Sequence, residues 1–343
     1  MDILILINVL VLAVLLPLLA LEFGVALIYL IAQKKYTVRM HDFIHASWEI
    51  SGTFLVFFIV NLEATYPGLV MDIGTLYLTP ILLAGAFLIF RNAFLAYREY
   101  AEDEAHEMRY STIYSFATII MVFLLISVLN SVVSGFGVNL SSMSASLFGI
   151  VVNIYNIAVF LSLAALSVLA ALVMFQIKSI KLFVQLFVFS LAIFLFAMME
   201  YVPYMFNAMG SNMATLILPA VLFVAMLALY VMQNKYAKFL VIPWIFTVIL
   251  ALQQFEYPYL FGGIINITNY LQPVQDEIYI ILITIAGAIL LLVGLGILFY
   301  AHRRSTTEAP DEPEVRAPER EHHVLDHKNQ PPRERPQLPK ISQ

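Results

Sequence analysis

The basic residues of this 343-residue chain alternate with its apolar segments in a fixed pattern. Twelve lysines and arginines precede residue 305, and they form clusters that stand between pairs of apolar segments: Lys34, Lys35, Arg39; Arg91, Arg98, Arg109; Lys178, Lys181; Lys235, Lys238; Arg303, Arg304. The loop inside each pair contains no lysine or arginine. Because cationic loops stay on the cytoplasmic side during insertion, the pattern predicts a multi-pass protein of the cytoplasmic membrane. Its amino terminus lies outside and its carboxyl terminus in the cytoplasm.

Composition agrees with a membrane protein. The chain is 62% hydrophobic and 12% charged, whereas about a quarter of the residues of a soluble domain are charged. About 20 apolar residues in a helix cross the ~30 Å hydrocarbon core, and continuous apolar runs indicate helices rather than barrel strands. We therefore predict an all-α integral membrane protein with nine transmembrane helices, at about 4–32, 47–67, 74–97, 111–135, 147–175, 180–205, 213–233, 237–256 and 277–301.

Motifs of soluble enzymes do not occur in the sequence. It has no cysteine, no Gly-rich phosphate loop, no GxSxG and no HExxH, so no thiolate metal site and no familiar catalytic motif is expected. A net charge of −5 does not suggest a nucleic-acid partner. The tail 305–343, with seven prolines, eight acids and six bases, is predicted to be disordered and cytoplasmic. Any chemistry is expected from ionisable groups inside the membrane.

Two carboxyl groups are predicted at the same depth near the cytoplasmic side. Glu22 lies about 19 residues into the first span and Glu49 two or three residues into the second, so both fall within the inner third of the bilayer at about 1.5 Å per residue. Two such groups on adjacent helices would form a proton entry from the cytoplasm. The alternative is that each is hydrogen-bonded to a neighbour such as Ser47 or Ser51, or reaches the interface.

Histidine placement argues against haem in this chain. Axial ligation needs His, Met, Cys or Tyr at membrane depth on facing helices. His41, His45, His106 and His302 lie in or beside cytoplasmic loops, and the other three are in the tail. A bis-histidine site is therefore excluded, and a single haem held by His45 or His302 is the remaining alternative.

Short motifs at the ends of the second and third spans carry a family resemblance. Trp48 and Glu49 open the second span, Pro67 closes it, and Arg91 and Arg98 end the third. This pattern resembles subunit II of the cytochrome bd quinol oxidases, where Trp-Asp, aromatic-Pro and two arginines seven residues apart take these places. The spacings of 19 residues from Trp48 to Pro67 and 24 from Pro67 to Arg91 equal those of the family.

Further motifs are similar, with departures. Residues 22–25 (Glu-Phe-Gly-Val) are similar to the acid-x-Gly-Val of the family, and Tyr257 with Pro258 is similar to its aromatic-Pro after the eighth span. Residues 49–54 (Glu-Ile-Ser-Gly-Thr-Phe) stand where the family has acid-Gly-Asn-Gln-x-Trp, and both family aspartates are glutamates here. The resemblance is good over about 20–100, thin over 110–235 and fair over 237–304, which suggests a divergent branch.

The resemblance implies a division of the nine spans. Two four-helix bundles would occupy residues 1–138 and 139–256. An outer loop and a peripheral ninth helix would occupy residues 257–304, and the tail follows at 305–343. It implies a haem-free or haem-poor subunit II that binds no cofactor alone and has no catalytic residue or metal site. Haems b and d are expected in the partner, subunit I, which oxidises quinol.

The resemblance also implies roles for single residues. Glu22 and Glu49 would deliver protons toward a haem in the partner. Structural or interface roles are expected for six residues, with Arg91 and Arg98 as anchors that contact lipid or quinone headgroups: Trp48, Pro67, Arg91, Arg98, Tyr257 and Pro258.

Two alternatives remain open. A pseudo-symmetric secondary transporter with a 4+4 repeat would use broken helices at matching positions, and Pro80 and Pro219 match under such a repeat. Both lie near the outer starts of their helices, where proline is well tolerated. A purely structural assembly subunit differs only in that Glu22 and Glu49 would not act in proton transfer.

Overall fold

The computed structural model describes residues 3–32, 37–99, 104–271, 278–289 and 293. For residues 3, 4, 32, 37–42, 44–46, 48, 49, 98, 99 and 104–107 it describes the backbone alone. The chain divides into a compact unit of residues 1–291 and a second unit of residues 292–343. The predicted tail 305–343 belongs to the second unit and lies outside the described residues.

The first unit is almost entirely helical. Its described elements are α1 (Ile3–Ala32), α2 (Thr37–Thr65), α3 (Pro67–Leu76), α4 (Leu78–Glu99), α5 (Glu104–Ser134), β1 (Val138–Asn139), β2 (Ser144–Ala145), α6 (Leu147–Val151), α7 (Ile154–Met174), α8 (Ile180–Tyr201), α9 (Pro203–Ser211), η1 (Met213–Leu216), α10 (Ile217–Val231), η2 (Lys235–Ala237), α11 (Lys238–Glu256), β3 (Tyr259–Leu260), β4 (Ile265–Asn266) and η3 (Ile267–Tyr270). A shorter apolar helix, Ile278–Ile289, comes after them in the chain.

Most of the predicted spans correspond to helices of the structure. Among the described residues, seven helices are long and apolar enough to cross a membrane, or eight if the bent pair of α2 and α3 is one span. The helix Ile278–Ile289 lies within the predicted ninth run, whose remainder is largely outside the described residues. The count of nine spans and the orientation of the termini therefore stay predictions.

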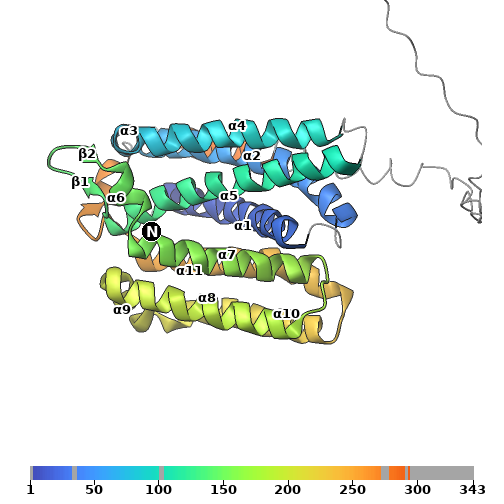
Figure 1. The fold of residues 1–343 in the computed structure, drawn as a ribbon. Helices are drawn as coiled ribbons and strands as arrows, with labels where there is room; N and C mark the ends of the chain where they lie inside the picture. The colour runs from blue at the N-terminus through green and yellow to red at the C-terminus, as the bar shows by residue number, and fades with distance from the viewer. Residues whose placement is uncertain (1–2, 33–36, 100–103, 272–277, 290–292, 294–343) are drawn as a thin grey trace, which may run out of the picture. The chain divides into compact units, whose positions relative to one another are not determined.

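The first helix lies at the centre of the packing. α1 contacts α2, α5, α7 and α11, while α4 pairs with α5, α7 with α8, and α10 with α11. In Figure 1 these long helices run side by side. The end of the bundle that carries the two short hairpins also holds α3, α6 and α9. Because α1 contacts helices on both sides of residue 138, it joins the two predicted bundles, whose boundaries remain predictions.

One glycine permits a close contact between α1 and α7. A Cβ atom on Gly24 would lie 2.0 Å from the carbonyl oxygen of Ser167, so the backbones of α1 and α7 touch here. Small residues allow such approach between membrane helices, where packing and hydrogen bonds drive association. Beyond this point Val25 and Ala26 pack against Ala171 and Leu172 in one buried cluster.

The structure differs from the sequence prediction at two prolines. The apolar runs predict that Pro67 closes the second span and that a loop follows over residues 68–73, but Pro67 begins α3, which turns 119° from the end of α2. Likewise α8 ends at Tyr201 rather than near residue 205, and Pro203 begins α9. The residue before a proline disfavours the helical conformation, whereas proline is well suited to the first position of a new helix. Each proline therefore ends one helix and starts another.

The two hairpins close the end of α5. β1–β2 and β3–β4 are antiparallel pairs. The N–H groups of Phe261 and Gly262 donate to the carbonyl oxygens of Val132 and Val133, which satisfies acceptors that the helix end leaves open. Nearby, the hydroxyl groups of Tyr77 and Ser131 are 2.9 Å apart.

The helix Ile278–Ile289 is attached to α2 by a polar contact and a close packing contact. The hydroxyl of Thr284 donates to Oδ1 of Asn61, and both side chains are buried. A Cβ atom on Gly287 would lie 2.6 Å from the ring of Phe57. This part of the predicted ninth span therefore packs directly on the second.

Candidate functional site

A buried ion pair joins α1 to α4. Nη1 of Arg91 donates to Oε2 of Glu22 over 2.7 Å, and the hydroxyl of Ser51 on α2 donates to Oε1 over 2.7 Å. The exposed fractions are 0% for Glu22 and 1% for both Arg91 and Ser51. Each carboxylate oxygen thus has a donor, and a buried charge that is paired and hydrogen-bonded is the form that a protein interior tolerates.

The arginine has further partners. Its Nε donates to Oδ1 of Asn92 over 3.2 Å, and its guanidinium carbon lies 5.8 Å from the ring centre of Tyr114 on α5. A cation within about 6 Å of an aromatic ring is attracted by the ring's quadrupole. Four helices, α1, α2, α4 and α5, therefore meet at one charged group.

The local sequence explains why these residues meet. Gly24, two residues after Glu22, lets α1 lie against the α7 backbone. This contact sets the position of α1 along the axis of the bundle. Ser47 and Ser51, one helical turn apart on α2, are both buried and so face inward together. Arg91 lies six residues, or about 9 Å, before the end of its span at Tyr97.

Of the two predicted proton-path residues, the structure describes the side chain of one and only the backbone of the other. Glu22 is buried at the centre of the ion pair. Glu49 belongs to α2, which packs against α1, but its side chain lies outside the described residues. The predicted meeting of the two carboxyl groups at one depth therefore stays a prediction. The hydrogen bond from Ser51, considered as an alternative for such an acid, is present at Glu22.

The residues predicted to serve structure or interfaces also have varied positions. Arg91, expected to anchor an interface and contact lipid or quinone headgroups, is enclosed by this chain and does not reach its surface. Pro67 is exposed at the start of α3, and Tyr257 and Pro258, joined by a cis peptide bond, connect α11 to β3. Two side chains, of Trp48 and Arg98, lie outside the described residues.

Sequence reasoning found Glu22 and Arg91 separately but missed that they form a pair. A signal was available, because a charge inside a span needs an opposite charge at the same depth. Glu22 and Arg91 both lie in the cytoplasmic half of their predicted spans. Tyr114 was missed altogether, since a tyrosine in an apolar run looks like core packing.

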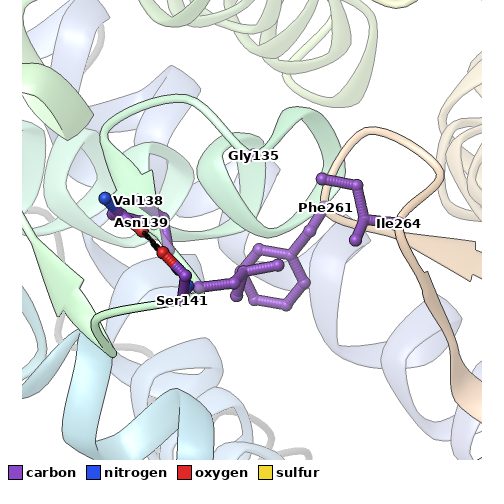
Figure 2. A pocket seen from close by; sticks show the side chains of 7 residues that line it. Gly135, Val138, Asn139, Ser141, Phe261 and Ile264 are labelled. Atoms are coloured by element: carbon purple, nitrogen blue, oxygen red, sulfur yellow. Dashed lines mark hydrogen bonds between the residues drawn. The ribbon is translucent and has the colours of Figure 1, made fainter.

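A pocket of about 360 Å³ lies at the hairpin end of the molecule, away from the ion pair. Figure 2 shows its labelled lining, in which the hydroxyl of Ser141 donates to Oδ1 of Asn139 over 2.7 Å. None of the seven lining residues is ionisable: Gly135, Val138, Asn139, Leu140, Ser141, Phe261 and Ile264. The ion pair, not this pocket, is therefore the candidate functional site.

A cofactor site does not emerge from the described side chains. They contain no group of three or more His, Cys, Asp or Glu that could hold a metal ion. The side chains of His41, His45 and His106, and all of His302, lie outside the described residues. The described site offers a carboxylate, a guanidinium and hydroxyl groups in a buried interior, and a carboxyl group there can accept, hold and pass a proton.

Comparisons with known proteins agree with these features. The family model for cytochrome bd terminal oxidase subunit II matches residues 1–303. Among solved structures, a chain from the structure of bd oxidase from Geobacillus thermodenitrificans matches with a TM-score of 0.69 and 18% sequence identity. The match covers 88% of this chain and 97% of that one. No curated protein matches the sequence. At this identity, the structural match establishes similarity of fold.

Proposed function

Since this chain belongs to the cytochrome bd terminal oxidase subunit II family, and is therefore a multi-pass membrane subunit of a respiratory oxidase that works with a partner subunit, we propose that it is the haem-free subunit of a quinol:oxygen oxidoreductase in the cytoplasmic membrane. Haems b and d, and the oxidation of quinol, belong to the partner. Membrane lipid and quinone are its other proposed partners. Family membership also favours this function over the secondary transporter.

The specific task of this chain is to bring cytoplasmic protons toward the partner. Reduction of oxygen to water consumes protons, so a buried oxidase needs a polar route to its reaction centre. The observation that carries the proposal is the carboxyl group of Glu22, which is fully buried and yet paired with Arg91 and hydrogen-bonded to Ser51. Intramembrane carboxyl groups of this kind are typical of proton relays. Glu49 is the entry group, one helix away.

Arg91 and Ser51 hold the carboxyl group of Glu22 in one orientation. Nη1 of Arg91 donates to Oε2 and the Ser51 hydroxyl donates to Oε1, so both carboxyl oxygens have a donor from another helix. A proton carrier fixed in this way keeps its position relative to the next group of the path.

The test separates proton transfer from scaffolding by removing both charges together. Glu22→Gln alone leaves Arg91 unpaired, so loss of assembly would not identify the cause. The double variant with Glu22→Gln and Arg91→Met removes both buried charges, which is often neutral or stabilising for a protein. We expect the double variant to assemble with normal haem content and to turn over quinol at least about tenfold more slowly. Normal turnover would show that the pair serves structure only.

A parallel test concerns the entry group. Glu49→Gln keeps the size of the side chain but cannot carry a proton, so turnover is expected to fall at least about tenfold with normal haem content. Glu49→Asp keeps the carboxyl group and should retain most activity. Full activity of Glu49→Gln, measured as quinol oxidation per haem, would remove Glu49 from the path.

A further inference from the structure

The hydroxyl group of Tyr114 is buried beside the ion pair with unused hydrogen-bonding capacity. The residue is 2% exposed, and its hydroxyl oxygen has no hydrogen-bond partner among the described residues. The flanking hydroxyl groups on α5 donate elsewhere, Ser115 to the carbonyl of Ser111 and Thr118 to the carbonyl of Tyr114 itself. A buried hydroxyl without a partner costs about 1–3 kcal/mol, so most such groups bind an ordered water.

Arg91 supplies the second half of a water site. Its guanidinium has five N–H groups, and within the described residues it makes one hydrogen bond to Glu22 and one to Asn92. Further N–H groups thus remain for another acceptor. The guanidinium lies over the Tyr114 ring, 5.8 Å from its centre. A buried water needs two to four polar partners, and the Tyr114 hydroxyl together with a guanidinium N–H group would supply two.

We propose that a buried water molecule is bound between the hydroxyl of Tyr114 and the guanidinium of Arg91, and that Tyr114 is a positioning residue for proton transfer through Glu22. The water accepts from a guanidinium N–H group and is hydrogen-bonded to the Tyr114 hydroxyl, so it holds the guanidinium in the orientation that pairs with Glu22. This inference rests on the proposed function, since it concerns how the ion pair is held for proton transfer.

The surroundings support a single water rather than a wider channel. On the other sides Tyr114 belongs to a buried cluster with Val25 and Tyr29 of α1, Leu95 of α4 and Leu172 of α7. The side chains of this cluster are mainly apolar, so the polar groups of the site come from Arg91 and Glu22. A water held there is shielded from bulk solvent.

The first experiment is a structure of the whole oxidase at a resolution where ordered waters are visible. We expect density within about 3 Å of the Tyr114 hydroxyl oxygen and of a guanidinium nitrogen of Arg91. Direct contact of that hydroxyl with a protein side chain, or no density there, would overturn the proposal. This measurement needs no variant, so it decides even if substitutions at Tyr114 impair assembly.

The second experiment is Tyr114→Phe, which removes the hydroxyl and keeps the ring over Arg91. We expect turnover to fall about tenfold at normal haem content, with a larger solvent isotope effect and loss of the water density. The matched control is Tyr77→Phe, which removes a buried hydroxyl at the hairpin end of the molecule and should leave turnover per haem unchanged.

The outcomes separate the two proposals. If Tyr114→Phe turns over at the wild-type rate while the Glu22→Gln, Arg91→Met double variant is slow, the water site fails and the proton path stands. If both are as fast as wild type, both proposals fail. A slow Tyr114→Phe variant with normal haem content supports the water site.

Discussion

At the scale of single residues, the interior of this chain is organised by polar side chains that satisfy one another. Nδ2 of Asn130 donates to Oδ1 of Asn156, and Nδ2 of Asn156 donates to the hydroxyl of Ser127. All three side chains are buried between α5 and α7. Bonds of this kind between membrane helices contribute about 0.6 kcal/mol each on average. The bond from Ser51 to Glu22 differs because its acceptor is charged, and such bonds contribute about 1.5–3 kcal/mol.

Ser51→Ala tests this difference. The substitution leaves Oε1 of Glu22 without its donor, so the thermal midpoint of the purified complex should fall, by more than for an uncharged hydrogen bond. Haem content should be retained, because the Arg91 partner remains. Ser115→Ala is the control, since that hydroxyl donates to a carbonyl of its own helix. Equal midpoints for both variants would show that the Ser51 bond adds no stability.

At the scale of elements, α1 depends on its contact with α7. The 2.0 Å separation between an imagined Cβ of Gly24 and the Ser167 oxygen cannot be relieved by rotating a side chain, because the obstacle is backbone. Any larger residue at position 24 must therefore move one helix. Since Glu22 is two residues away, such a shift also disturbs the ion pair with Arg91.

Gly24→Ala is therefore expected to destabilise the complex by about 1–3 kcal/mol or more and to lower the yield of haem-containing oxidase. The control is Gly85→Ala on α4, where an added Cβ meets nothing within 4 Å in this chain. Alanine favours a helix over glycine by about 1 kcal/mol, so the control should be neutral or stabilising. Thermal midpoints of both purified variants give the comparison, and a Gly24→Ala complex as stable as wild type would contradict the contact.

Sequence periodicity and hydropathy predicted the existence of most elements, because length and apolar composition alone decide whether a helix can span. They did not predict α3, since Pro67 reads equally as the end of a helix or the start of one. Nor did they pair Glu22 with Arg91, because hydropathy gives depth along a helix but not which faces of two helices meet. The close approach at Gly24 decides that, and it is a tertiary contact.

At the scale of the whole molecule, the distribution of charge defines two different ends. Every lysine and arginine before the tail lies in or next to the predicted cytoplasmic loops, except Arg91, which lies in the cytoplasmic half of its span. The end that carries the β1–β2 and β3–β4 hairpins has loops without any of them. The positive-inside rule therefore predicts that the hairpins face outward and the ion pair lies nearer the cytoplasm.

Cysteine labelling tests this orientation cleanly, because the native chain has no cysteine. Ser141→Cys, exposed between β1 and β2, should react with a membrane-impermeant reagent added outside intact cells. Ser305→Cys, at the start of the tail, should react only after the cytoplasmic side is opened. Labelling of both positions from one side would contradict the nine-span model, in which five spans separate them.

The ion pair joins side chains that are 69 positions apart, and this separation has a consequence for synthesis. At about 5–20 residues per second, α1 waits roughly 3–14 s in the membrane before Arg91 is made. During that time the Glu22 carboxyl group has no arginine. When α4 arrives, its arginine costs about 2.5–3.5 kcal/mol to insert at the centre of a lone helix, and the waiting acid offsets part of that cost. Because α1 is synthesised first, α4 packs against an α1 that is already in the membrane during biogenesis.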